Sequence, residues 1–118
     1  MSIFDWLFGP KARQISVQEA YVLLQNANPP LIVDVRQLVE TKDGIVAGAI
    51  VIPLTEFGER YAELPPEQQI LTICRSSHRS PLAARRLLKA GYQVLDVQGG
   101  MIAWQEAGLP VQTANTDQ

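Results

Sequence analysis

Residues 70–81 of this chain read Ile70-Leu71-Thr72-Ile73-Cys74-Arg75-Ser76-Ser77-His78-Arg79-Ser80-Pro81. An apolar stretch, typical of a buried strand, ends at a thiol, and a polar loop then leads to a Ser-Pro pair that favours a helix start. Such a loop and helix N-terminus surround an anionic sulfur with N–H groups and partial positive charge, which lowers the thiol pKa. We therefore expect Cys74 to be reactive. We also expect it to be accessible, because five polar residues follow it directly.

Length and composition restrict the kind of protein. The chain has 118 residues, a net charge of −2, one cysteine and one histidine. This length predicts one domain. A single cysteine excludes an intramolecular disulfide and a cysteine-rich metal site, and one histidine disfavours a zinc centre, so we expect no metal and no cofactor. The cysteine usage and the lack of a convincing targeting segment predict a cytoplasmic location.

Positive charge is concentrated around Cys74. Between Gln68 and Leu95 there are five of the ten Lys and Arg residues and no acidic residue. The overall charge gives no attraction for nucleic acid, but this local field favours a small anionic substrate. We assign that role to Arg75 and Arg79. The other three cations are expected on the exposed C-terminal half of a helix: Arg85, Arg86 and Lys89.

Strand and helix patterns alternate along the chain. Apolar runs predict buried strands over 31–35, 50–53, 70–73 and 94–97. Helices are expected over 16–27, 55–61 and 80–90 and around Trp104, with Ser16, Thr55 and Ser80 as N-caps and Gly91 as a stop. This order predicts an α/β domain with a mainly parallel sheet of about four to five strands and helices on both faces. Ligands of such sheets lie beyond the C-terminal strand ends, where Cys74 is placed.

The two ends of the chain differ from the part between them. We expect an N-terminal apolar segment at 1–12, a domain at 13–111 and a polar C-terminal tail at 112–118. Residues 3–8 fall far short of the ~20 residues that span a bilayer. We interpret them as a short helix, stopped by Gly9-Pro10 and packed on the domain. Contact of residues 3–8 with a membrane surface or a second subunit is the alternative.

Four motifs occur in a family-like order. They are Asp34-Val35-Arg36; Gly44 to Ala49 followed by Ile52-Pro53; Cys74 to Ser80; and Gly99 to Trp104 followed by Ala107 to Val111. With this spacing, the chain from about Ile15 to Val111 resembles the single-domain rhodanese-like (thiosulfate sulfurtransferase-like) proteins. Three positions depart from the family pattern: Ile45 and Ala47 replace histidine and proline, and Ser77 stands where glycine is frequent. If position 77 needs a positive φ, serine is strained there.

The resemblance implies a sulfurtransferase. The Cys74 thiolate would take a sulfane sulfur from a small anionic donor, thiosulfate or a persulfide, and pass it to a thiol or cyanide. Because the chain has no second cysteine, the acceptor has to be an external thiol or a protein. Arg79 is expected to guide the donor, and the rest of the loop to bind the sulfur or the anion: Arg75, Ser76, Ser77, His78 and Ser80. A lone loop histidine is, however, commonly solvated.

Other assignments accompany this reading. Asp34 and Arg36 are expected to support the loop from beneath rather than to act in catalysis. A cysteine-dependent phosphatase or arsenate reductase stays open as an alternative, but its loop is one residue longer than the four residues that separate Cys74 from Arg79. A non-catalytic rhodanese-like binding module is the second alternative. The presence of Cys74 favours an enzyme over it.

Overall fold

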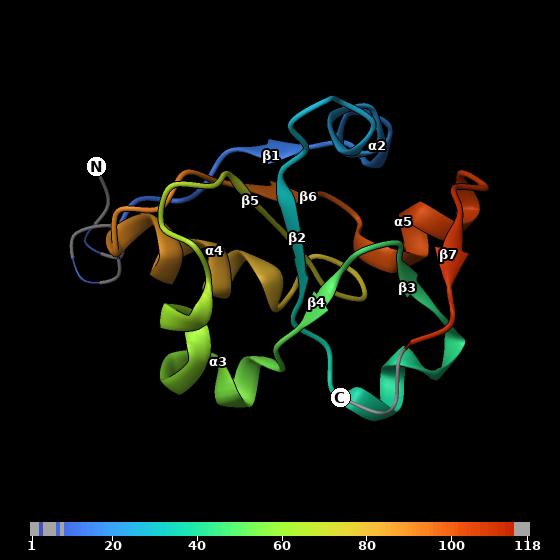
Figure 1. Ribbon diagram of the computed structural model, residues 1–118. Coiled ribbons are helices and arrows are strands. Elements are labelled where there is room, and N and C mark those ends of the chain that lie inside the picture. The colour runs from blue at the N-terminus through green and yellow to red at the C-terminus, as the bar shows by residue number, and fades with distance from the viewer. Residues whose placement is uncertain (1–2, 4–6, 8, 115–118) are drawn as a thin grey trace.

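A parallel sheet of five strands forms the centre of the computed structural model, which describes residues 3, 7 and 9–114 (Figure 1). The strand order is β1-β6-β5-β2-β4, and every neighbouring pair is parallel. The strands are β1 (Gln14–Ile15), β2 (Leu31–Asp34), β4 (Ile50–Val51), β5 (Ile70–Ile73) and β6 (Val94–Val97). Two further short strands, β3 (Ile45–Val46) and β7 (Val111–Gln112), pair antiparallel beside this sheet. The predicted α/β class and parallel sheet are confirmed.

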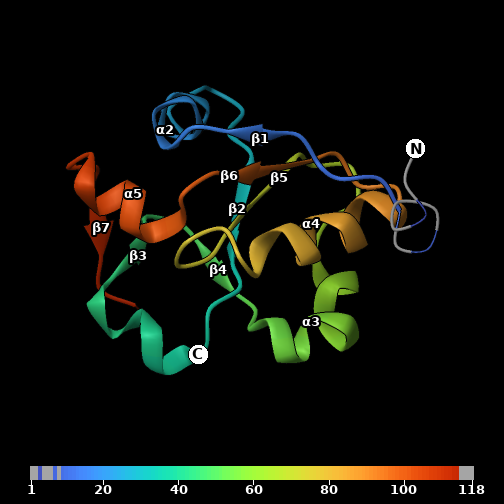
Figure 2. The same ribbon diagram turned by 180° about the vertical axis from the view of Figure 1, so that it is seen from behind.

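Helices cover both faces of the sheet. They are α2 (Val17–Leu24), α3 (Leu54–Arg60), α4 (Ser80–Lys89) and α5 (Gly100–Glu106), with 3₁₀ turns η1 (Leu38–Asp43) and η2 (Tyr61–Glu63). Helices α3 and α4 lie on one side, and α2 and α5 lie on the other (Figures 1 and 2). Side chains alternate along each strand, so neighbouring residues enter different cores. Val33 packs with Phe57 and Leu87 on the α3/α4 side, and Ile32 packs with Trp104 on the α2/α5 side.

The helix boundaries follow the sequence signals only in part. Ser16 forms the expected capping box with Glu19, with hydrogen bonds of 3.0 and 3.1 Å. Gly91 has the positive φ, +95°, expected of a helix stop. Helix α2 ends at Leu24, however, three residues before the predicted end. Helix α3 has Pro53 rather than Thr55 as its N-cap, and Thr55 lies inside the helix, where its hydroxyl accepts a hydrogen bond from Gln37.

The predictions that strand 50–53 is buried and that Arg85 is exposed are wrong. Among the described strands, β4 pairs only with β2, at the edge of the sheet, so Ile50 is 38% exposed although its run reads as a buried strand. In α4, the residues that face the sheet are spaced by three and four, which turns Leu82 outward to 51% exposure. Arg85 is only 5% exposed rather than solvated, and its guanidinium donates a hydrogen bond to the Gly9 carbonyl.

Most of the predicted N-terminal helix lies outside the described residues. Ile3 and Leu7 are described, and both are exposed. Among the described residues, no helix combines the length and the apolar character needed to cross a membrane.

Candidate active site

The loop after β5 lies between the beginnings of α4 and α5, as both ribbon views show (Figures 1 and 2). The first turn of α5 holds this loop: the Met101 N–H donates to the Cys74 carbonyl at 2.8 Å, and the Ile102 N–H donates to the Arg75 carbonyl at 3.1 Å. A Cβ atom on Gly100 would overlap both carbonyls. The Gly99-Gly100 pair therefore supports the loop. The sequence motif alone did not indicate this role.

Cys74 is fully buried, at 0% exposure, so the expectation that its thiol is accessible is wrong. Strand alternation explains the burial: Cys74 continues β5 and joins the core of Ile70 and Leu87 on the α4 side. The polar loop does reach solvent, but it folds back over the sulfur.

The surroundings of Cys74 favour the thiolate. Burial is the largest single influence and raises the pKa of the Cys74 thiol, but hydrogen bonds to the sulfur outweigh it and hold the pKa below its ordinary value. The donors are the Ser80 hydroxyl and the backbone N–H groups of Ser80, Arg79 and Ser76. The Ser80 hydroxyl is buried and has no hydrogen-bond partner elsewhere among the described residues, so we infer that it interacts with the sulfur. Ser80 is therefore not the predicted N-cap. Arg79 holds that position.

Ser77 is the one described residue other than glycine with a positive φ, +73°. A backbone in this region is unfavourable for serine by steric contact with its Cβ. The side chain offsets this cost, because its hydroxyl accepts a hydrogen bond of 2.5 Å from the Gly99 N–H. The position thus has the conformation that the frequent glycine of the family suggests, and serine supplies a third hydrogen bond between the loop and the start of α5.

Arg79 forms a salt bridge that the sequence did not predict. Its guanidinium binds both carboxylate oxygens of Glu40, in η1, at 2.6 and 2.7 Å. This hydrogen-bonded pair lowers the pKa of Glu40 to about 2 and raises that of Arg79. The negative charge of the Cys74 thiolate also raises the pKa of Arg79. No signal in the chain pairs these residues, which are 39 positions apart.

Asp34 and Arg36 form a buried ion pair at the end of β2. The Arg36 guanidinium binds Asp34 through contacts of 2.8 to 3.1 Å, and both side chains are at most 1% exposed. Arg36 also donates to the carbonyls of Glu40 and Gly44 and to the carboxylate of Asp43. The Arg36 guanidinium thus holds the backbone of η1 in place. Because η1 carries Glu40, the Asp34–Arg36 pair supports the Cys74 loop indirectly, through the Glu40–Arg79 salt bridge.

The other loop residues are on the outside. Arg75 is exposed, and within the described chain its side chain has no ion pair. The Ser76 hydroxyl and the His78 Nδ1 share a hydrogen bond of 3.0 Å at the surface. Neither of these two side chains is among the groups that lower the pKa of Cys74.

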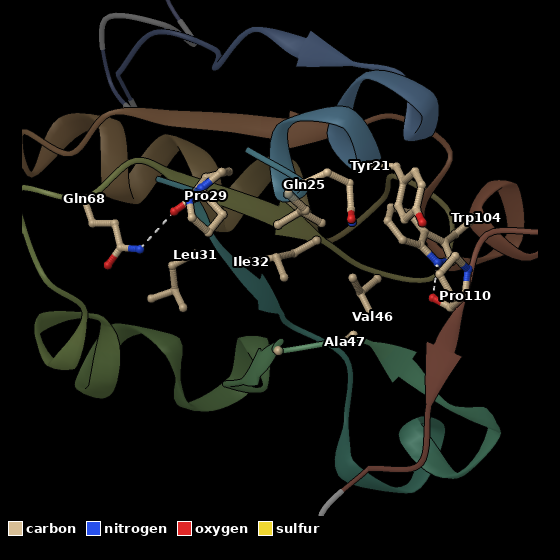
Figure 3. A pocket seen from close by; sticks show the side chains of 13 residues that line it. Tyr21, Gln25, Pro29, Leu31, Ile32, Val46, Ala47, Gln68, Trp104 and Pro110 are labelled. Atoms are coloured by element: carbon tan, nitrogen blue, oxygen red, sulfur yellow. Dashed lines mark hydrogen bonds between the residues drawn. The ribbon is translucent and has the colours of Figure 1, made fainter. Parts of the chain in front are cut away.

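A concavity of about 380 Å³ lies at the opposite end of β2 from Asp34 (Figure 3). Its wall includes Tyr21, Ile32 and Trp104, and none of the described Lys, Arg, Asp or Glu residues lines it. Cys74 is not part of it. In the part of the chain that the structure describes, no three His, Cys, Asp or Glu residues are placed to bind a metal ion.

Comparison with known proteins agrees with this geometry. The family model of the rhodanese-like domain matches residues 16–107. The chain belongs to the rhodanese-like family. A sulfurtransferase of Allochromatium vinosum is 35% identical over 89 residues, which cover 75% of this chain and 83% of that protein. A putative sulfurtransferase of Bacillus subtilis is 31% identical over 67% of this chain and 77% of its own length.

Solved structures show the same fold. A rhodanese-related protein from Thermoplasma volcanium superposes with a TM-score of 0.81 at 30% identity, covering 86% of this chain and 99% of that one. Other curated relatives are longer, and this rhodanese-like chain spans 39% and 40% of two of them. The family is thus one of sulfurtransferases, and its domain also occurs within larger proteins.

Proposed function

We propose that this rhodanese-like protein transfers a sulfane sulfur through a persulfide on Cys74. The Cys74 thiolate attacks the outer sulfur of a donor, and the bond between that sulfur and the rest of the donor breaks. The Cys74 persulfide then gives its outer sulfur to a thiol or to cyanide, which restores the thiolate. The observation that supports this reaction is the set of hydrogen-bond donors around the sulfur, which lower the pKa of Cys74.

The surrounding residues have distinct parts in the proposal. The N–H groups of the loop and the Ser80 hydroxyl stabilise the negative charge on the thiolate and then on the persulfide. Because the thiol has no exposed surface, the loop over it shifts when a donor binds. Asp34 and Arg36 act as structural supports. Arg75, Ser76, Ser77 and His78 form the rim that a donor meets, and the acceptor is an external thiol or protein, since Cys74 is the single cysteine.

Two further features favour sulfur transfer over a phosphatase reaction. The loop places four residues between Cys74 and Arg79, and Arg79 binds Glu40 rather than extending toward an open oxyanion site. We place the reaction in the cytoplasm, where thiols stay reduced.

Intact-mass measurement tests the proposal. After incubation with thiosulfate or with an alkyl persulfide, the wild-type chain should gain one sulfur atom, and Cys74→Ser should gain none. Addition of a thiol or cyanide should then remove the extra atom. If the wild type gains no sulfur from either donor, the proposed function is wrong.

A further inference from the structure

In the sequence, the cations around Cys74 have no acidic residue near them. In the fold, carboxylates from other segments bind the arginines at this end of the sheet. Arg79 is bound by both oxygens of Glu40, at 2.6 and 2.7 Å. Arg36 is bound by Asp34 and by Asp43. Of the three arginines that follow β2 and β5, which are Arg36, Arg75 and Arg79, Arg75 alone has no ion pair with a described residue. Most of the positive charge at this end of the sheet is therefore neutralised.

We propose that Glu40 is a positioning residue that determines donor specificity: by binding Arg79, it makes the site select an alkyl persulfide over thiosulfate. This inference rests on the proposed sulfur transfer and narrows its donor class. Glu40 does not touch the reacting atoms and acts through Arg79, whose charge interacts with that of Cys74.

The charge balance of the two reactions explains the selection. With an alkyl persulfide, RS–SH, the Cys74 thiolate binds the outer sulfur, the RS–S bond breaks, RS⁻ leaves, and the proton stays on the transferred sulfur. With thiosulfate, the S–S bond breaks and sulfite leaves as a dianion. The neutral persulfide adds no charge to that of the thiolate, so the first reacting pair carries one negative charge, whereas thiosulfate adds two and the second pair carries three. Like charges repel strongly in a poorly solvated site, so the thiosulfate reaction needs a cation that Glu40 has already neutralised.

Glu40→Gln tests this effect, because glutamine keeps the shape and removes the charge. The readout is the ratio of two second-order rate constants for sulfur uptake by Cys74, with thiosulfate and with the persulfide of 2-mercaptoethanol, followed by intact mass. We expect this ratio to rise about ten-fold in Glu40→Gln. Glu63→Gln is the matched control, since Glu63 binds only Arg60 at the surface, and it should leave the ratio unchanged. The double variant Glu40→Gln/Arg79→Gln should lose the gain.

An unchanged ratio in Glu40→Gln, or a gain that persists without Arg79, would overturn the inference while sulfur uptake itself continues. Failure of the wild type with both donors would instead contradict the proposed function. If the Glu40→Gln variant does not fold, the salt dependence of the wild-type rate constant tests the same inference. Its thiosulfate rate constant should change less than about two-fold between about 20 and about 300 mM NaCl. A fall of about ten-fold over that range would show an uncompensated positive site and overturn the inference.

Discussion

The Gly99 N–H donates a hydrogen bond of 2.5 Å to the Ser77 hydroxyl and so joins the Cys74 loop to the start of α5. This bond gives a residue in an unfavourable conformation, φ +73°, a compensating contact. The two effects can be separated by substitution.

Ser77→Ala should destabilise the fold by about 1–2 kcal/mol, because it keeps the unfavourable φ and leaves the Gly99 N–H without its partner. Ser77→Gly also loses the hydrogen bond but relieves the backbone, so it should stay within about 1 kcal/mol of the wild type. Urea denaturation of both variants measures the difference. Equal stability of the two variants would show that φ at this position costs nothing.

Gly100→Ala should cost about 2–4 kcal/mol and displace the loop, because the added Cβ overlaps the carbonyls of Cys74 and Arg75. Gly108→Ala is the matched control, since Gly108 also has a positive φ, +70°, but nothing lies within 4 Å of its added Cβ. The control should lose only about 1 kcal/mol. Denaturation curves and the Cys74 pKa of both variants report the outcome. A similar loss in both would contradict the close approach of α5 to the loop.

The thiolate absorbance of Cys74 should titrate below the pH of a free cysteine, because hydrogen bonds from the loop lower its pKa despite burial. Sulfur uptake should rise with pH through the same range and then level off, as the thiolate is the reacting form. Ser80→Ala removes one donor and should move both curves to higher pH. Ser76→Ala is the control, because the Ser76 hydroxyl bonds to His78 and its backbone N–H is kept.

Glu40 should make stability depend on acid pH. Its pKa is lowered from 4.5 to about 2 by the hydrogen bond with Arg79, so the unfolded chain takes up the proton first as the pH falls. The stabilisation is therefore complete above pH 4.5 and is lost between 4.5 and about 2. Partial exposure limits it to about 1–2 kcal/mol. Glu40→Gln should be less stable than the wild type at pH 7 by this amount, and the gap should close toward pH 2, as urea denaturation across this range would show.

Asp34→Asn should destabilise the fold by about 3–5 kcal/mol, because it leaves the Arg36 charge buried without its main partner. Asp43→Asn provides the comparison: Asp43 binds the same guanidinium, but its side chain is 58% exposed. That change should cost no more than about 1 kcal/mol. Thermal and urea denaturation measure both. If the two costs were equal, burial would not govern the value of these ion pairs.

Much of the fold follows from local patterns in the sequence. The capping box at Ser16, the apolar run that becomes β5 and the glycine stop at Gly91 each act over a few residues, so they can be read directly from the chain. The short strands β1 and β3 could not be read in this way. β1 and β3 have two residues each, too few to show a period, and they form because a partner strand lies beside them.

The sequence by itself determined the family motifs and the identity of Cys74 as the single thiol. The tertiary structure alone decided that Cys74 is buried, that Gly100 lies against the loop and that Arg79 binds Glu40. The physical reason is how far apart along the chain the interacting residues lie. Capping and backbone conformation depend on neighbours along the chain, whereas the electrostatics of the sulfur depend on η1, α4 and α5, which meet only when the sheet has formed.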